Sequence, residues 1–253
     1  MNNTYNLFTK AKEYQDKRKA VNDEYESTVK HLEKMRGSEY YQDETKKAAT
    51  KRDEAISALK AEYKPILDSI LQEMRTVAEN RPLKAPTEEE LRIVQALKLR
   101  DYDSIPKGNK DLSGIESSLK RVANAVKGNA LCLGIVQDVA RRNGIHYNFT
   151  SVFTGENVPD ETLSVLFDRI AGRLGDFLSY DTSMASRIAR EGHERMYGKL
   201  DENNPAHKVL FGESSGFRPI AKRPLFNTKE ECFSQLFEIN GKELELFAAC
   251  VDN

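Results

Sequence analysis

The sequence predicts a mainly α-helical protein: a long N-terminal helical hairpin or coiled-coil arm, a small helical bundle, and a C-terminal helical region with a minor β-hairpin. Apolar residues recur three or four positions apart over long stretches, which is the period of one helix face. Charged residues make up 31% of the 253 residues and the mean hydropathy is -0.64, as in a solvent-exposed coiled coil. Helix-start and helix-stop residues divide the chain into residues 1–80, 81–145 and 146–253.

Residues 1–80 are predicted to form the arm. A first helix spans residues 5–36 and ends at Gly37-Ser38, a helix stop. Its apolar face carries Val21, Tyr25, Val29, Leu32 and Met35. The second helix repeats its apolar residues close to the a/d spacing of a coiled-coil seam. Seven residues are predicted to form this seam and to make the arm's protein contacts: Ile56, Leu59, Tyr63, Ile66, Ile70, Met74 and Val77.

Two arrangements of the arm fit the sequence. The short break near residues 37–42 suggests an antiparallel hairpin, whereas an unbroken rod would recruit a second chain. In both, Pro65 should kink or restart the second helix because it lacks a backbone N–H. Basic and acidic side chains are equally numerous over residues 1–80, which favours specific helix pairing over binding of a polyanion. A two-helix arm cannot bury its apolar stripe alone, so the stripe needs the body of the protein or another subunit.

Residues 81–145 are predicted to form the small bundle. A stiff linker over residues 80–86 precedes Thr87, which makes a capping box with Glu90 three positions later. The helix that follows should run to about Arg100, with an inward face of Leu91, Val94 and Leu97. Two further helices follow a polar loop. Three short helices joined by short loops are typical of a small bundle.

Residues 146–253 are predicted to be rich in helix, with a small β element. The stretch over residues 145–153 alternates in polarity and contains β-branched and aromatic residues, which suits a strand. Asp160 should cap a helix whose inner face carries Leu163, Leu166, Ile170, Leu174 and Phe177. A second helix is expected from Asp181 to Gly198.

The last part of the chain carries a turn signal and several phenylalanines. Asn240-Gly241 lies between alternating apolar flanks, which predicts a β-hairpin. Thr228 and Glu231 have the spacing of another capping box. Four aromatic residues are predicted to be buried on a surface that docks on a neighbouring subunit: Phe226, Phe233, Phe237 and Phe247.

No residue pattern predicts catalysis, and neither a metal nor a cofactor is expected. None of the histidines lies at metal-ligand spacing, and no phosphate-binding loop or nucleophile elbow occurs. Glu191, His193 and Glu194, with Asp168 on the preceding helix, form the most enzyme-like group, and they fit a solvated helix face better.

The charge and the cysteines restrict the class of partner. A formal net charge of -1 gives no overall field toward DNA or anionic lipid, so nucleic-acid binding is not expected. No run of about 18 apolar residues occurs, so no membrane span is expected. Cys132, Cys232 and Cys250 form no CxxC pair and are expected to be free thiols in a reducing compartment.

Three stretches carry a resemblance to a group of phage proteins: "AISALKAEYKPILDSI", "PTEEELRIVQALKLRD" and "KGNALCLGIVQDVARRNGI". In this order, over roughly residues 45–145, the chain resembles uncharacterised proteins that tailed bacteriophages and prophages encode among their capsid and head-assembly genes. The shared short runs include Glu90-Leu91, Gln95-Ala96-Leu97 and Gly128-Asn129-Ala130-Leu131. None is a catalytic motif, so the resemblance implies a role in the virion or its assembly and no active-site residue.

Three functions fit these features. The first is a non-enzymatic phage structural or virion-assembly protein that contacts further copies of itself, the phage capsid protein, or both. It would act in the host cytoplasm during assembly, with the virion as a second location. The alternative is a soluble helical binding protein, such as a phage-encoded inhibitor of a host or defence enzyme. The third is an enzyme with an unrecognised helical active site, for which a buried carboxylate–histidine cluster around His193 would be the first sign.

Overall fold

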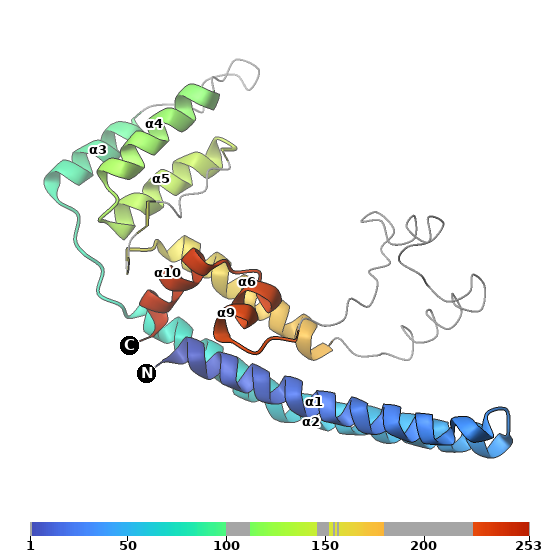
Figure 1. Cartoon of the computed structure of the whole chain (residues 1–253). Helices are drawn as coiled ribbons and strands as arrows, with labels where there is room; N and C mark the ends of the chain where they lie inside the picture. The colour runs from blue at the N-terminus through green and yellow to red at the C-terminus, as the bar shows by residue number, and fades with distance from the viewer. Residues whose placement is uncertain are drawn as a thin grey trace.

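The computed structural model describes residues 2–99, 112–145, 152, 153, 155, 157–179 and 225–252, and over them the regular structure is helical, without strands (Figure 1). The mainly α prediction is confirmed for this part of the chain. A 3-10 turn, η1 (Glu33–Met35), and a π-helix, η4 (Cys232–Leu236), accompany the α-helices. These α-helices are α1 (Asn3–Leu32), α2 (Glu39–Glu79), α3 (Glu88–Lys98), α4 (Leu112–Ala125), α5 (Ala130–Arg142), α6 (Asp160–Ser179), α9 (Lys229–Glu231) and α10 (Gly241–Val251).

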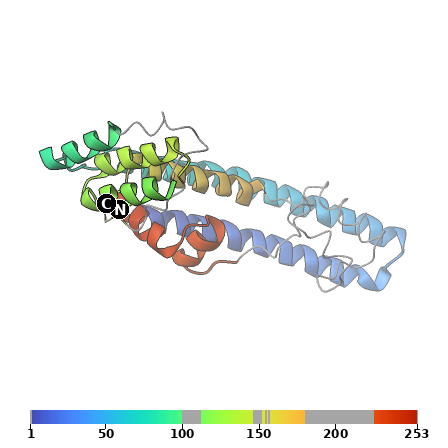
Figure 2. The same cartoon turned by 90° about the horizontal axis from the view of Figure 1, so that it is seen from above.

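Helices α1 and α2 form an antiparallel hairpin that projects as an arm from the other helices (Figure 1 and Figure 2). The turn contains Gly37, whose φ of 95° lies in the left-handed region that glycine adopts without a Cβ penalty. Ser38 then caps α2, because its hydroxyl oxygen accepts a hydrogen bond from the Tyr41 backbone N–H at 3.1 Å. Of the two arrangements that fit the sequence, the chain therefore adopts the hairpin.

Helix α2 continues through Pro65, so the expected restart of the helix at that residue is wrong. Pro65 lies on the exposed side of α2. The carbonyl that has no intrahelical donor because of the proline belongs to Ala61, which is also exposed. Water can satisfy this carbonyl, and the helix is not forced to break.

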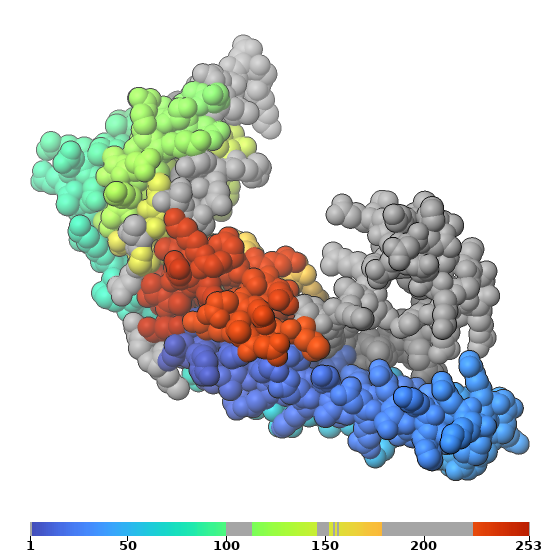
Figure 3. Space-filling view, viewed as in Figure 1, coloured from blue at the N-terminus to red at the C-terminus, as the bar shows by residue number. Residues whose placement is uncertain are grey.

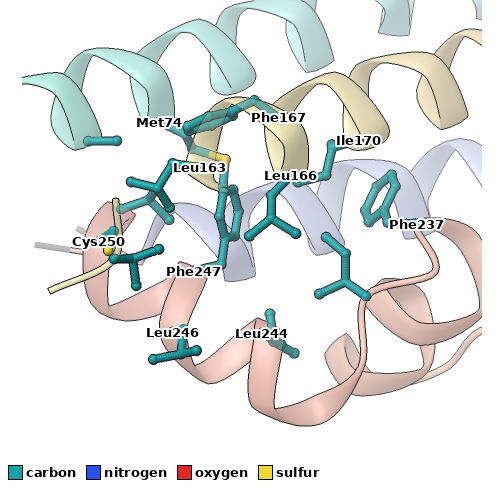
Figure 4. Close-up of a cluster of buried hydrophobic side chains, with 14 of the residues drawn as sticks. Met74, Leu163, Leu166, Phe167, Ile170, Phe237, Leu244, Leu246, Phe247 and Cys250 are labelled. Atoms are coloured by element: carbon teal, nitrogen blue, oxygen red, sulfur yellow. The ribbon is translucent and has the colours of Figure 1, made fainter. Parts of the chain in front are cut away.

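The core lies where the base of the arm, residues 3–18 of α1 and 63–79 of α2, meets α6, η4 and α10 (Figure 4). Met74 of α2 lies beside Phe167 of α6, and the Phe167 ring packs edge-on against Phe247 of α10 with ring centroids 5.1 Å apart. Phe233 and Phe237 make a second edge-on pair at 5.2 Å. Full burial of each such ring contributes about 1.5–3 kcal/mol. The predicted inner face of α6 is confirmed, since all five of its residues are buried: Leu163, Leu166, Ile170, Leu174 and Phe177.

The two ends of the described chain meet beside this core. The Asn3 side-chain amide donates to the Val251 carbonyl at 2.7 Å, at the C-terminal end of α10. The Thr4 backbone N–H donates to an Asp252 carboxylate oxygen, also at 2.7 Å. A carboxylate at the N-terminal end of α1 is favoured by the helix dipole, so this contact helps to hold α10 on the base of the arm.

Helices α3, α4 and α5 form the small bundle (Figure 1). The predicted capping box is present: the Thr87 N–H donates to the Glu90 carboxylate at 2.7 Å, and the Glu90 N–H donates to the Thr87 hydroxyl at 3.2 Å. The predicted inward face of α3 is only partly right. Val94 and Leu97 are buried, but Leu91 is 40% exposed; α3 ends at Lys98, close to the expected end. The bundle buries Val94, Leu97, Ile115, Leu119, Leu133 and Val136.

Two buried polar side chains fasten the linker between arm and bundle. The Arg81 guanidinium donates to the Val158 carbonyl and to an Asp160 carboxylate oxygen, each at 2.6 Å, at the start of α6. The Asn129 side-chain amide donates to the Lys84 carbonyl at 2.9 Å. The Asn129 side-chain oxygen also caps α5, so one residue starts a helix and holds the linker.

The predicted β-hairpin at Asn240-Gly241 is wrong, because Asn240 starts a helix. Asn240 has a φ of -73°, whereas a type I′ turn requires a positive φ there. Its side-chain oxygen accepts from the Glu243 N–H at 3.0 Å, and the Glu243 carboxylate accepts from the Asn240 N–H at 3.0 Å. This capping box and the buried face of Leu244, Phe247 and Val251 produce α10.

The predicted strand over residues 145–153 falls largely outside the described residues. Ile145, Val152 and Phe153 are described and lie in no strand. The predicted helix over residues 181–198 is also outside the described ranges. The predicted capping box of Thr228 and Glu231 is only half present: the Thr228 hydroxyl accepts from the Glu231 N–H at 3.1 Å, but the Glu231 carboxylate accepts from the Asn227 N–H at 2.7 Å.

Candidate interaction surface of the arm

The predicted seam of α2 lies mostly inside the chain's own core. Four of its seven residues are buried, Leu59 and Val77 are half-buried, and Ile66 is 37% exposed. In place of Ile66, the neighbouring Leu67 is 0% exposed. Both residues lie at helical spacing from Tyr63, so the period alone could not choose between them. The four buried residues are Ile56, Tyr63, Ile70 and Met74.

Within the part of the chain that the structure describes, other helices cover the base of the arm and leave its outer part thinly covered. At the base, residues 3–18 and 63–79, the Tyr14 ring lies 5.7 Å from the Tyr63 ring and 5.2 Å from the Phe177 ring of α6. The outer arm, residues 19–62, stands out as a narrow rod (Figure 3). Beyond Arg18, the buried side chain of α1 is Leu32, and the predicted apolar face of Val21, Tyr25 and Val29 is half-buried, with Met35 exposed.

A shallow groove of about 440 Å³ lies along the outer arm between α1 and α2. Most of its lining is aliphatic, and three of the aliphatic residues are alanines, which keep the two helix backbones accessible. Lys17 and Glu62 line the groove where it approaches the base. The aliphatic residues are Ala20, Val21, Ala55, Ala58 and Leu59.

Two interhelical ion pairs lie on the side of the arm that carries the groove. Lys17 Nζ lies 3.2 Å from Glu62 Oε1, and Lys51 Nζ lies 2.9 Å from Glu24 Oε1. Glu24 follows Val21, and Lys51 precedes Ala55, at helical spacing, so the second pair lies on the groove face toward the tip. The groove is therefore apolar in the middle, with one cation and one anion at each end.

The ion pairs shift the pKa of Lys17, Glu24 and Lys51 toward the charged form. The hydrogen bonds that the Lys17 ammonium donates to the Tyr63 hydroxyl and to the Glu62 carboxylate raise the pKa of Lys17. The Lys51 ammonium lowers the pKa of Glu24, and Glu24 raises the pKa of Lys51. These pKa shifts favour the charged forms of Lys17, Glu24 and Lys51 at neutral pH.

Arg52 of the arm is buried although its sequence context predicts an exposed residue. Arg52 lies in a run of charged residues that reads as solvated surface, yet it is only 7% exposed. Its guanidinium lies over the Tyr25 ring, 4.5 Å from the centroid, and its Nε donates to Asp53 at 2.8 Å. Arg52 precedes Ile56, a seam residue, by four positions and therefore lies on the same helix face. This spacing was the signal that could have predicted its burial.

The four phenylalanines predicted to dock on a neighbouring subunit offer no surface for docking. Phe226, Phe233, Phe237 and Phe247 are each 0% exposed. They pack within the chain: Phe226 lies 6.3 Å from Phe8 of α1, and Phe233 lies 6.4 Å from Phe247, between ring centroids. Their burial was expected, but the base of the arm and α6 supply the covering surface, so the docking role is corrected.

The most enzyme-like group of the sequence is not assembled in the described residues. Glu191, His193 and Glu194 lie outside them, and Asp168 makes an ion pair with Arg75 at 3.0 Å. Within the described ranges, no three His, Cys, Asp or Glu side chains gather as metal ligands would. The three cysteines are buried, and burial raises the pKa of Cys132 and of Cys232, which disfavours a reactive thiolate.

Comparison with known proteins returned no match to a family model, to a curated protein or to a solved structure. Among the described helices, none combines the length and the hydropathy that crossing a membrane requires.

Proposed function

We propose that the protein is a non-enzymatic structural or assembly protein of a tailed-phage or prophage particle, acting through protein–protein contacts. The observation that carries the proposal is the outer arm: a projecting hairpin whose apolar groove the described parts of the chain leave open. An assembly protein needs such a surface, and many identical weak contacts add up in a symmetric particle. The resemblance over residues 45–145 supports the phage context.

The partners proposed for this surface are further copies of the chain, the phage capsid protein, or both. The protein would act in the host cytoplasm during assembly, and it would be found in the virion if it is retained. The equal numbers of basic and acidic side chains in the arm favour helix pairing over nucleic-acid binding.

The test is to follow the chain through particle assembly in the phage or prophage that encodes it. Mature particles and head-assembly intermediates would be separated on a density gradient, and the chain would be quantified in each by mass spectrometry. We expect it in at least one of these fractions, and we expect gene disruption to reduce the yield of filled heads. Absence from every particle fraction with a normal head yield would overturn the proposal and favour the soluble inhibitor.

A further inference from the structure

We propose that the groove of the outer arm is filled by the same groove of a second copy, with the two arms antiparallel. The two copies are related by a two-fold axis that crosses the middle of the groove at a right angle to the arm. Each tip then points toward the base of the other copy. This inference rests on the proposed function, because it names the partner of the surface that carries it.

The shape of the groove suits another pair of helices. Ala20, Ala55 and Ala58 lack long side chains, so helices from a second copy can approach to the 8–10 Å separation of packed helices. Val21 and Leu59 remain partly exposed in the same groove and would lose that exposure. Two hairpins stacked in this way make a four-helix bundle in which every neighbouring pair of helices is antiparallel.

The charges at the groove ends complement each other under this axis. On α1, Lys17 lies at the base end of the groove and Glu24 at the tip end. The two-fold axis exchanges the ends, so Glu24 of the second copy lies over Lys17 of the first. On α2, it brings Lys51 of the second copy over Glu62. Each ion pair within one hairpin thus extends into an alternating cluster of four charges, which fixes the register of an isologous contact.

Exposed Ile66 distinguishes this axis from one parallel to the arms. Ile66 follows Glu62 by one helical turn and is 37% exposed, an unusual position for isoleucine. Under the perpendicular axis it lies near Ala48 of the second copy. Under the parallel axis it would lie among the charged residues Lys10 and Glu13 of α1, which would leave it without an apolar neighbour.

The groove also opens on the side of the arm that faces away from α6. Arg75 lies on the side of α2 that faces α6, because its guanidinium lies 4.9 Å from the Phe167 ring centroid and pairs with Asp168 of α6. By the helix period, Ala55 and Glu62 lie on the opposite side of α2. The second arm can therefore lie along the groove without displacing α6 or α10.

The first test compares two alanines of α2 that are both exposed, one in the groove and one on the outer side. The molar mass of the purified full chain would be measured by sedimentation equilibrium over a concentration series. We expect a dimer for the wild type and for Ala61→Glu. Because both copies contribute Ala58 to the symmetric contact, Ala58→Glu introduces two charges into it. It should weaken dimerisation about tenfold or more. A wild-type monomer throughout the series, or equal dimerisation by both variants, would overturn the proposal.

The second test reverses charges while keeping the ion pairs within each hairpin. The double variant Lys17→Glu/Glu62→Lys retains its own pair but places like charges against Glu24 and Lys51 of the second copy, so its dimer should weaken. Adding Glu24→Lys/Lys51→Glu again places an opposite charge of the second copy against each of the four charged residues, so it should restore the dimer. A double variant that dimerises like the wild type would exclude this axis, because the parallel axis tolerates that exchange.

These tests separate the inference from the proposed function. Dimerisation is measured on the purified chain and does not require particles. A monomer that still enters particles overturns the inference alone, whereas a dimer that is absent from every particle fraction overturns the proposed function alone.

Discussion

The base and the outer part of the arm share one hairpin and one apolar period, but among the described residues only the base is covered by other helices. At the base, Tyr14 and Met74 are fully buried beneath rings from α6 and α10. In the outer arm, Val21 and Leu59 stay partly exposed beside a groove. The difference shows that helical periodicity identifies a face that needs covering and does not identify what covers it.

The largest expected effect comes from opening the core beneath the base. Phe247→Ala removes a fully buried ring from beside Phe167, so it should lower the free energy of unfolding by about 3–5 kcal/mol. Val165→Ala is the matched control on the exposed side of α6 and should change it by no more than about 0.5 kcal/mol. Chemical denaturation followed by circular dichroism measures both. Similar values for the two would contradict the assignment of the core.

The adjacent residues Leu67 and Ile66 test where the covered face runs. Leu67→Ala should lower the free energy of unfolding by about 2–5 kcal/mol because Leu67 is fully buried. Ile66→Ala should cost about 0.5 kcal/mol or less in the monomer, and it should weaken the dimer instead. Denaturation at low protein concentration separates the two effects. If Ile66→Ala lowered the free energy of unfolding more than Leu67→Ala, Ile66 and not Leu67 would belong to the buried face.

The tip of the outer arm depends on one backbone conformation. Gly37→Ala should lower the free energy of unfolding by about 1–2 kcal/mol, because an alanine Cβ is strained at a φ of 95°. Gly37 has open space around the site of a Cβ, so backbone strain alone would act. Gly241→Ala, which also has open space and no positive φ, should be neutral or slightly stabilising. Equal losses for both would show that the turn does not need the left-handed conformation.

The smallest effect concerns the ion pair at the tip end of the groove. Lys51→Met removes the ammonium that lowers the pKa of Glu24, so the pKa of Glu24 should rise toward its ordinary value of 4.5. In the wild type, the contribution of this pair is present above the unfolded pKa of Glu24 and is lost as the pH falls through the lower folded pKa. NMR titration of the Glu24 carboxyl carbon measures the change. An unchanged pKa would mean that the pair does not form in solution.

Local sequence was sufficient where a few neighbouring residues decide the structure. Thr87 with Glu90, and Ser38 after Gly37, mark helix ends because their side chains or backbone conformation satisfy nearby backbone groups. The face of α6 was predictable because five apolar residues share one helix period. The same reasoning failed at Asn240, where the alternating flanks and the Asn-Gly pair predicted a hairpin and the capping box of Asn240 with Glu243, three positions later, starts a helix.

The candidate surface was only partly predictable. The seam residues were identified by their period, but four of them serve the chain's own core. The groove and its ion pairs join residues 45 and 27 positions apart, Lys17 with Glu62 and Glu24 with Lys51, so their meeting depends on the register of the hairpin. No local pattern sets that register, because it follows from the length of the turn and the packing between the helices.

The amino-acid sequence was enough to predict a mainly helical chain, the helix stop at Gly37, most helix starts and the identity of the apolar faces, because each depends on residues within a turn or two of one another. Tertiary packing settled the rest. It paired the two arm helices as a hairpin, buried the four phenylalanines inside the chain, chose Leu67 over Ile66 and buried Arg52 against Tyr25. It also left a groove on the outer arm that no other described segment covers. Burial is a property of two surfaces that meet, and the residues of one surface cannot specify the other.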